Sequence, residues 1–281
     1  MGLPSYQQPV TSALNSFEHA RLVATDFDGT THNTFESGPD IYSVDEVYRI
    51  AVEQTFDFDS DALRRYTDEG EHGNRTPAEI VHSLAPRATQ EGVERLTSEL
   101  VAAKLTILLR QIGRPLADGA PWPRPVPGFV DCWNAVTAAR QNGDIINTAF
   151  ISAGHASFIR LVLRASGLEQ PDILVTEETI RGLNSPLPPS RLSKPVPLAL
   201  MLAKVQWLNM HGAWLTGDLS SERVNERITM IGDSAEKDGG LAGNLGVDFI
   251  HVAEGDTGQA WGRMTQKLKL GTFAAKQGVQ T

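Results

Sequence analysis

Short apolar runs that stop at small or acidic residues recur along this chain. Runs of this length that end in turn residues are typical of buried strands. The predicted strands are residues 22–25, 145–151, 173–176, 228–231 and 249–252. Stretches with helical spacing alternate with them, at residues 155–166 and 198–209 and around Phe129, Trp133 and Val136. This alternation predicts an α/β fold, with a parallel sheet and helices on both of its faces.

The interval between the first two predicted strands is far too long for a single crossover connection. Its pattern is helical, because Ser43 with Glu46 forms a candidate capping box and Thr76-Pro77 predicts a second helix start. A third helix carries an apolar stripe at Val93, Leu96, Leu100, Ala103 and Ile107. We therefore expect a mainly helical cap domain at residues 33–126, between core segments 1–32 and 127–281.

Two further segments have a distinctive composition. Residues 114–128 are rich in proline and are expected to form a hinge or linker that returns to the core. Residues from about 271 onward are small and polar and are expected to be disordered.

Asp26 and Asp28 follow directly after the first predicted strand, in Asp26-Phe27-Asp28-Gly29-Thr30. In open α/β sheets, ligands bind beyond the carboxyl ends of the strands. One of two carboxylates there can attack an electrophile while the other exchanges a proton with the leaving group, and a divalent cation offsets their repulsion. A simple strand-to-turn junction is the alternative, since Asp and Gly favour turns.

Ser152-Ala153-Gly154 ends the second long apolar run and precedes a predicted helix. The Ser152 hydroxyl and the N–H groups of Ala153 and Gly154 could bind a phosphate oxygen, as helix N-termini do. An ordinary helix N-cap is the alternative. His155, the next residue, is expected to lie on the surface at the helix start.

Lys194 and Asp233 are the remaining candidates for the chemistry. Lys194 stands before a proline-marked helix start and could neutralise both a phosphoryl group and a nucleophile, or could simply be solvated. Asp233 ends the fourth predicted strand and is placed to hold a hard cation, with Asp238 reaching the metal's waters and Glu236 a weaker competitor. The glycines at 239–246 are expected to serve close helix packing, because their spacing matches no nucleotide fingerprint.

In this order the motifs resemble those of the haloacid dehalogenase-like superfamily, whose members are mostly Mg²⁺-dependent phosphatases. The resemblance implies a Rossmann-like core with an inserted cap. It also implies that Asp26 is the nucleophile, Asp28 the acid/base, Ser152 a phosphate ligand and Lys194 the balancing charge. Asp233 would bind Mg²⁺ beside Asp26 and the main-chain carbonyl of Asp28, with Asp238 nearby. Gly29, Thr30, Ala153 and Gly154 complete the expected substrate-binding set.

Asp28 favours phosphoryl transfer over carbon–halogen cleavage, because the dehalogenating members lack this second aspartate and a halide leaving group needs no proton. A phosphatase that acts on a small phosphorylated metabolite is therefore the leading hypothesis. A phosphotransferase or phosphomutase would use the same carboxylates. A non-catalytic phosphate-binding module is the third possibility, disfavoured because a binder needs neither nucleophile nor acid/base.

The composition argues against several other classes of protein. The net charge of −9, from 25 basic and 34 acidic residues, offers no footprint for nucleic acid. The single Cys132 excludes an internal disulfide, the first residues lack a signal pattern, and no apolar run reaches membrane-spanning length. We expect a cytoplasmic enzyme with no membrane partner, and the sequence does not indicate its oligomeric state.

The predicted cap contains weaker candidates for substrate contact and for metal binding. The polar stretch 68–75, with His72 and Arg75, is the candidate substrate-facing loop, and a solvated interhelical loop is the alternative. Asp57, Asp59 and Asp61 resemble the start of a calcium loop but lack its glycine and its bidentate Glu, so they are expected to form a solvated helix start.

Overall fold

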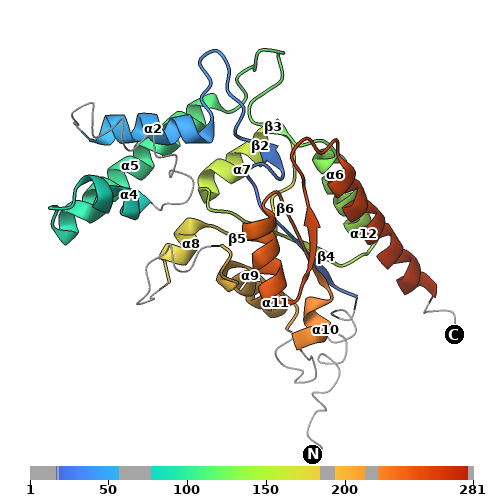
Figure 1. The fold of residues 1–281 in the computed structure, drawn as a ribbon. Helices are drawn as coiled ribbons and strands as arrows, with labels where there is room; N and C mark the ends of the chain where they lie inside the picture. The colour runs from blue at the N-terminus through green and yellow to red at the C-terminus, as the bar shows by residue number, and fades with distance from the viewer. Residues whose placement is uncertain (1–16, 18, 57–76, 184–193, 213–220, 278–281) are drawn as a thin grey trace, which may run out of the picture.

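A five-stranded parallel sheet forms the centre of the computed structural model, which describes all residues except 1–16, 18, 57–76, 184–193, 213–220 and 278–281 (Figure 1). The strand order is β5-β4-β1-β6-β7. The strands are β1 (Arg21–Thr25), β4 (Ile146–Ile151), β5 (Ile173–Val175), β6 (Ile228–Gly232) and β7 (Asp248–His251). All five strands predicted from the apolar runs are confirmed, with ends that differ by at most one residue.

Alternate residues of the central strand β1 face opposite sides of the sheet, and each side carries its own hydrophobic core. Val23 packs with the helices of one side, whereas Leu22 and Ala24 pack with those of the other. The helices on the first side are α6 (Phe129–Gln141), α7 (Ala156–Ala165) and α12 (Gln259–Gln277). The other side carries α8 (Glu177–Arg181), α9 (Leu198–Met210), α10 (Ser221–Asn225) and α11 (Gly240–Leu245). The predicted α/β architecture with helices on both faces is confirmed.

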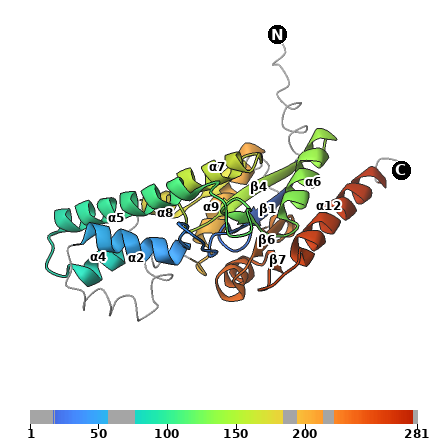
Figure 2. The ribbon, with the colours of Figure 1, turned by 90° about the horizontal axis from the view of Figure 1, so that it is seen from above.

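The insertion between β1 and β4 is helical, as predicted. Its helices are α2 (Val44–Thr55), α4 (Pro77–Leu84) and α5 (Gln90–Gln111), and Figures 1 and 2 show them grouped at one side of the sheet. The capping box at α2 is present, because Glu46 N donates to Ser43 Oγ at 3.2 Å and Ser43 N donates to Glu46 Oε2 at 2.8 Å. The predicted stripe of α5 packs against α2 and α4 in a third hydrophobic cluster.

The base of the insertion is tied to the core. The short strands β2 (His32–Asn33) and β3 (Arg124–Pro125) pair antiparallel where the chain leaves and re-enters the core. Trp122 is buried and its Nε1 donates to the Glu36 carbonyl at 3.0 Å. Leu116 and Trp122 of the proline-rich stretch 114–128 pack into the core, and the role of this stretch as a hinge or linker stays a prediction. The limits of the cap domain, 33 and 126, stay a prediction.

Helix α12 (Gln259–Gln277) extends into the C-terminal segment that was expected to be disordered, and that expectation stays a prediction. Of the helices in the described ranges, none is long and apolar enough to cross a bilayer.

Candidate active site

The carboxyl ends of the parallel strands bring the predicted motifs to one edge of the sheet. Asp26 follows β1, Ser152 follows β4 and Asp233 follows β6, and these three strands are neighbours. The strand that lies beyond β4, β5, ends at Val175, and Glu177 follows it at the same edge. Three motifs that are 126 and 81 residues apart in sequence are therefore adjacent in the fold.

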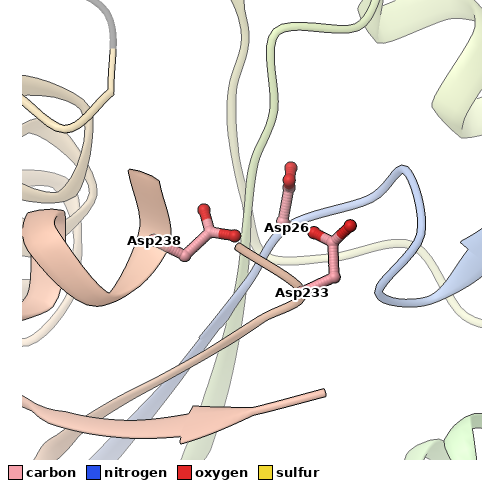
Figure 3. Close-up of side chains that lie close together, drawn as sticks. All are labelled: Asp26, Asp233 and Asp238. Atoms are coloured by element: carbon pink, nitrogen blue, oxygen red, sulfur yellow. The ribbon is translucent and has the colours of Figure 1, made fainter. Parts of the chain in front are cut away.

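Three carboxylates meet at this edge. The side chains of Asp26, Asp233 and Asp238 place one oxygen each within 4.8 Å of one another, and Figure 3 shows them converging from separate segments. Asp238 is fully buried in a single π-helical turn, η4 (Ala235–Gly239), whereas Glu236 is exposed. Hard divalent cations such as Mg²⁺ prefer such oxygen donors, so the residues present fit a magnesium site.

Lys194 is the cation that this cluster contacts. Its Nζ lies 3.0 Å from Asp26 Oδ1 and 2.6 Å from Asp238 Oδ1. Burial alone would lower the pKa of Lys194, but the carboxylates of Asp26 and Asp238 outweigh it and raise that pKa above its usual value. Lys194 therefore stays protonated and offsets part of the negative charge.

One lysine does not neutralise the cluster. Burial, reinforced by the neighbouring carboxylates and opposed by Lys194, raises the pKa of Asp26 to about 8. Burial and Asp238 likewise raise the pKa of Asp233. Buried carboxylates that resist ionisation require additional positive charge to act as anions at neutral pH. The raised pKa values and the geometry of the oxygen donors therefore both indicate a cation at this site.

Asp28 has a different environment from Asp26. Thr34 Oγ1 donates to Asp28 Oδ1 at 2.7 Å, which fixes the carboxyl group. Burial raises the pKa of Asp28, while the Thr34 hydrogen bond and then the charge of Lys104 lower it. A raised pKa favours a carboxyl group that carries a proton it can give away.

Gly29 and Thr30 shape the position of Asp233. Gly29 has φ +70, and a Cβ placed on it would overlap the Asp233 carboxylate. Thr30 is fully buried; its Oγ1 donates to Asp233 Oδ1 at 3.1 Å and accepts from Asp233 N at 2.9 Å. The hydroxyl of Thr30 therefore orients a carboxylate of the cluster, and the substrate contact expected for Thr30 stays a prediction.

The Ser152 turn lies against Asp28. A Cβ placed on Gly154 would be 3.1 Å from Ser152 Oγ and 3.6 Å from Asp28 Oδ2. The Gly154 N–H donates to Ser152 Oγ at 2.9 Å, so it is not free for an anion as the sequence suggested. The Ser152 hydroxyl thereby accepts one hydrogen bond and keeps its own proton to donate. The main-chain N–H of Ala153 stays a predicted phosphate donor.

His155 is not the surface residue expected at a helix start. Its side chain is only 2% exposed, and Nδ1 lies 3.0 Å from Glu178 Oε1. Burial, followed by the charge of Lys104, lowers the pKa of His155 although Glu178 acts in the opposite direction. The expectation was wrong because α8, at the end of β5, covers the start of α7.

Sequence reasoning missed Thr34, Lys104 and Glu178, which hold or face the site. Lys104 had a readable signal, because it stands one turn after Leu100 and so interrupts the apolar face of α5. Thr34 and Glu178 carried no such pattern. The glycine stretch serves packing as expected, since a Cβ on Gly239 would lie 3.1 Å from the Phe249 ring. The candidates at 57–61 and 68–75, with His72 and Arg75, lie outside the described residues.

Comparison with known proteins identifies similar folds but no close relative. No family model matches the chain, and no curated protein matches it significantly. The crystal structure of β-phosphoglucomutase from Clostridium difficile has a TM-score of 0.52 at 10% identity, over 89% of this chain and 99% of that one. CbbY from Rhodobacter sphaeroides, in complex with phosphate, gives 0.48 at 17% identity over 83% and 86%. A haloacid dehalogenase-like hydrolase from Bacteroides fragilis gives 0.46 at 18% identity over 83% and 87%.

The TM-score of 0.52 to the β-phosphoglucomutase supports a shared fold, and the 10% identity does not establish the activity. The sheet order, the motif positions at the strand ends and the helical insertion after the first motif agree with that likeness. The chain therefore has the fold of that β-phosphoglucomutase, a parallel α/β core with an inserted helical segment.

Proposed function

We propose that this protein is a Mg²⁺-dependent phosphatase that hydrolyses a small-molecule phosphomonoester through an aspartyl-phosphate. The observation that carries the proposal is the separation of two aspartates into different environments. Asp26 lies in the carboxylate cluster, 3.0 Å from Lys194, whereas Asp28 is held by Thr34 outside that cluster. A nucleophile and an acid/base need this difference, because one must be anionic while the other keeps its proton.

The first step joins an Asp26 carboxylate oxygen to phosphorus and breaks the bond between phosphorus and the leaving oxygen. Asp28 gives its proton to that oxygen, so the alcohol leaves neutral. Lys194 keeps its charge beside Asp26, and the Ser152 hydroxyl is placed to hold a phosphoryl oxygen. When bound, Mg²⁺ supplies the positive charge that lets the acidic cluster accept a phosphate dianion, and Asp26, Asp233 and Asp238 would hold it.

The second step releases phosphate. Asp28, now ionised, takes a proton from a water molecule as the water oxygen attacks phosphorus and the bond to Asp26 breaks. Asp26 returns to a carboxylate and Asp28 to its protonated form. All atoms are therefore accounted for by the two aspartates, the ester and one water.

The helical insertion supplies leaving-group specificity in this proposal. Every group assigned to the chemistry lies on the sheet edge, so the core provides phosphate recognition and little that distinguishes one alcohol from another. Helix α5 contacts α7, the helix that follows the Ser152 turn, and so brings the insertion to the site. Exclusion of water by the cap would strengthen the electrostatics of the charged centre.

A phosphomutase or phosphotransferase is the second candidate. It would use the same carboxylates and pass the phosphoryl group to a hydroxyl of a sugar. The observation that favours keeping it is the fold likeness to β-phosphoglucomutase. The difference between the two activities lies in the acceptor, which is water in one case and a bound alcohol in the other.

A panel of phosphorylated metabolites with Mg²⁺ tests the proposal. We expect release of inorganic phosphate from at least one member, abolished by excess EDTA and restored by Mg²⁺. Asp26→Asn should be inactive on the same substrate. Conversion to an isomeric phosphate without release would favour the mutase, and full activity in excess EDTA would exclude the mechanism proposed here.

A further inference from the structure

Lys104 is a buried cation on the insertion. It is 5% exposed, on the face of α5 that also buries Leu100 and Leu108. The structure gives Lys104 no hydrogen bond and no ion pair among the described residues; its Nζ lies 3.5 Å from the centroid of the Tyr48 ring. A cation–π contact offsets only part of the cost of burying an unpaired ammonium. Because no acceptor among the described residues takes its N–H donors, this group can bind an anion.

The charge of Lys104 faces the catalytic edge of the sheet. Burial raises the pKa of Asp28 and of Glu177 and lowers that of His155, and the charge of Lys104 acts to lower the pKa of all three. These three residues follow β1, β4 and β5. In Figure 1 α8 lies below α5, and in Figure 2 the two helices overlap, so α8 lies beneath the insertion. Lys104 thus stands opposite the edge where the leaving group of a phosphoester would be.

An unsatisfied polar atom lies on the core side of the same place. His155 Nε2 is buried without a hydrogen-bond partner, although Nδ1 of the same ring faces Glu178. Glu177 and Arg181, which lie nearby, form an ion pair with each other at 2.9 Å. Buried polar atoms are rarely left unpaired in native proteins, so such a group indicates a ligand.

The tautomer of His155 decides what its free nitrogen can do. The carboxylate of Glu178 accepts the proton of Nδ1, so Nε2 carries a lone pair and acts as an acceptor. A hydroxyl group is the matching donor. Lys104, in contrast, matches an oxyanion.

We propose that Lys104 and His155 form a subsite for the leaving alcohol, in which Lys104 binds a carboxylate or second phosphate and His155 accepts a hydrogen bond from a hydroxyl group. The proposal rests on the phosphatase function above and names its substrate class: an acidic, hydroxylated phosphomonoester. In this proposal the two lysines have different roles: Lys194 contacts the nucleophile, and Lys104 selects the leaving group.

Matched probes test whether the subsite prefers a leaving group with a second negative charge. Glycerol 3-phosphate has a neutral end, 3-phosphoglycerate replaces it with a carboxylate, and glycerol 1,3-bisphosphate carries a second phosphate there, with the C2 hydroxyl present in all three. The measured quantity is the ratio of kcat/KM for each anionic probe to that for the neutral one, so any effect common to all probes cancels. We expect at least one ratio of about tenfold or more in the wild type. The larger of the two ratios shows whether the subsite prefers a carboxylate or a phosphate.

Variants of Lys104 test whether this residue causes the preference for the anionic probes. Lys104→Met should reduce it to about one, with Lys104→Gln as a second neutral variant, and Lys104→Arg should keep most of it. Arg95→Gln is the control, because Arg95 is an exposed cation of the same helix, paired with Glu99. A melting temperature for each variant checks folding, and Met fills the same space against Tyr48 without a buried charge.

His155 has its own probe pair. Propyl phosphate has the chain of glycerol 3-phosphate without its hydroxyls, and His155→Leu should lower the preference for the hydroxylated probe several-fold. Equal wild-type activity on all three charge probes, or an unchanged ratio in Lys104→Met, would overturn the subsite while leaving the phosphatase proposal intact. No phosphate release from any probe, 4-nitrophenyl phosphate included, would overturn the proposed function and the subsite with it.

Discussion

Replacement of Gly29 by alanine tests whether the turn after Asp28 exists to admit the Asp233 carboxylate. The backbone at Gly29 has φ +70, and the added methyl group would overlap Asp233 Oδ2 and lie 3.0 Å from its carboxyl carbon. Gly167 provides a matched control, because it has φ +69 and a Cβ there would meet nothing within 4 Å. The two variants share the backbone strain and differ only in the collision with Asp233.

The expected magnitudes follow from that comparison. An L residue in the left-handed region costs about 1–2 kcal/mol, and the reduced freedom of the unfolded chain returns about 0.4–1 kcal/mol, so each variant should lose about 1 kcal/mol of unfolding free energy. Only Gly29→Ala should also displace Asp233, which Thr30 holds by two hydrogen bonds. Disturbing the orientation of a metal ligand typically lowers metal affinity or activity about 10–100-fold.

Two readouts separate stability from metal binding. Urea unfolding in EDTA measures the backbone cost, and the rise in melting temperature with added Mg²⁺ measures binding to the folded protein. Gly29→Ala should need about 10–100 times more Mg²⁺ than Gly167→Ala for the same rise and for half-maximal phosphate release. If the two variants respond to Mg²⁺ alike, Asp233 does not hold the metal in the way described.

Two further predictions concern proton donation by Asp28 and the burial of His32. Asp28→Asn should lose far more kcat/KM on an alkyl phosphate than on 4-nitrophenyl phosphate, because a good leaving group needs little protonation; equal losses, with Mg²⁺ binding intact, would end the acid/base assignment. Burial lowers the pKa of His32 to about 3, so the unfolded chain gains its proton first as the pH falls below about 6.5. Wild type should lose about 2 kcal/mol of unfolding free energy through this residue between pH 7 and pH 5. Urea unfolding of His32→Gln should lack that loss, and an identical pH dependence would contradict it.

The chemical groups of the sheet edge could be predicted because their position follows from topology. Parallel strands end at one edge, so residues that follow three apolar runs must meet there, whatever the details of packing. Asp26 and Asp233 are brought together in this way, as is Ser152 beside them. Lys194 enters on the segment that precedes α9, and its contact with Asp26 was implied only by the resemblance to a known family.

The contacts that depend on how helices sit on the sheet were beyond the sequence. Lys104 interrupts an apolar face, yet only the placement of α5 shows that it faces the core. His155 was misjudged because Glu178, which pairs with it, follows a different strand by a short connection. Thr30 stands in a turn, and its hydrogen bonds to Asp233 join positions that are 203 residues apart. Such long-range polar pairs leave no periodic pattern to detect.

The identity of the phosphorylated residue is the most direct test of the proposed mechanism. The enzyme is mixed with an active phosphomonoester and Mg²⁺, quenched in acid within a turnover, and reduced with borohydride, which converts an aspartyl-phosphate to homoserine. Peptide mass spectrometry then locates the homoserine. We predict it at position 26, and in no position for Asp26→Asn. Homoserine at position 28, or none in wild-type enzyme quenched during rapid turnover, would contradict nucleophilic attack by Asp26.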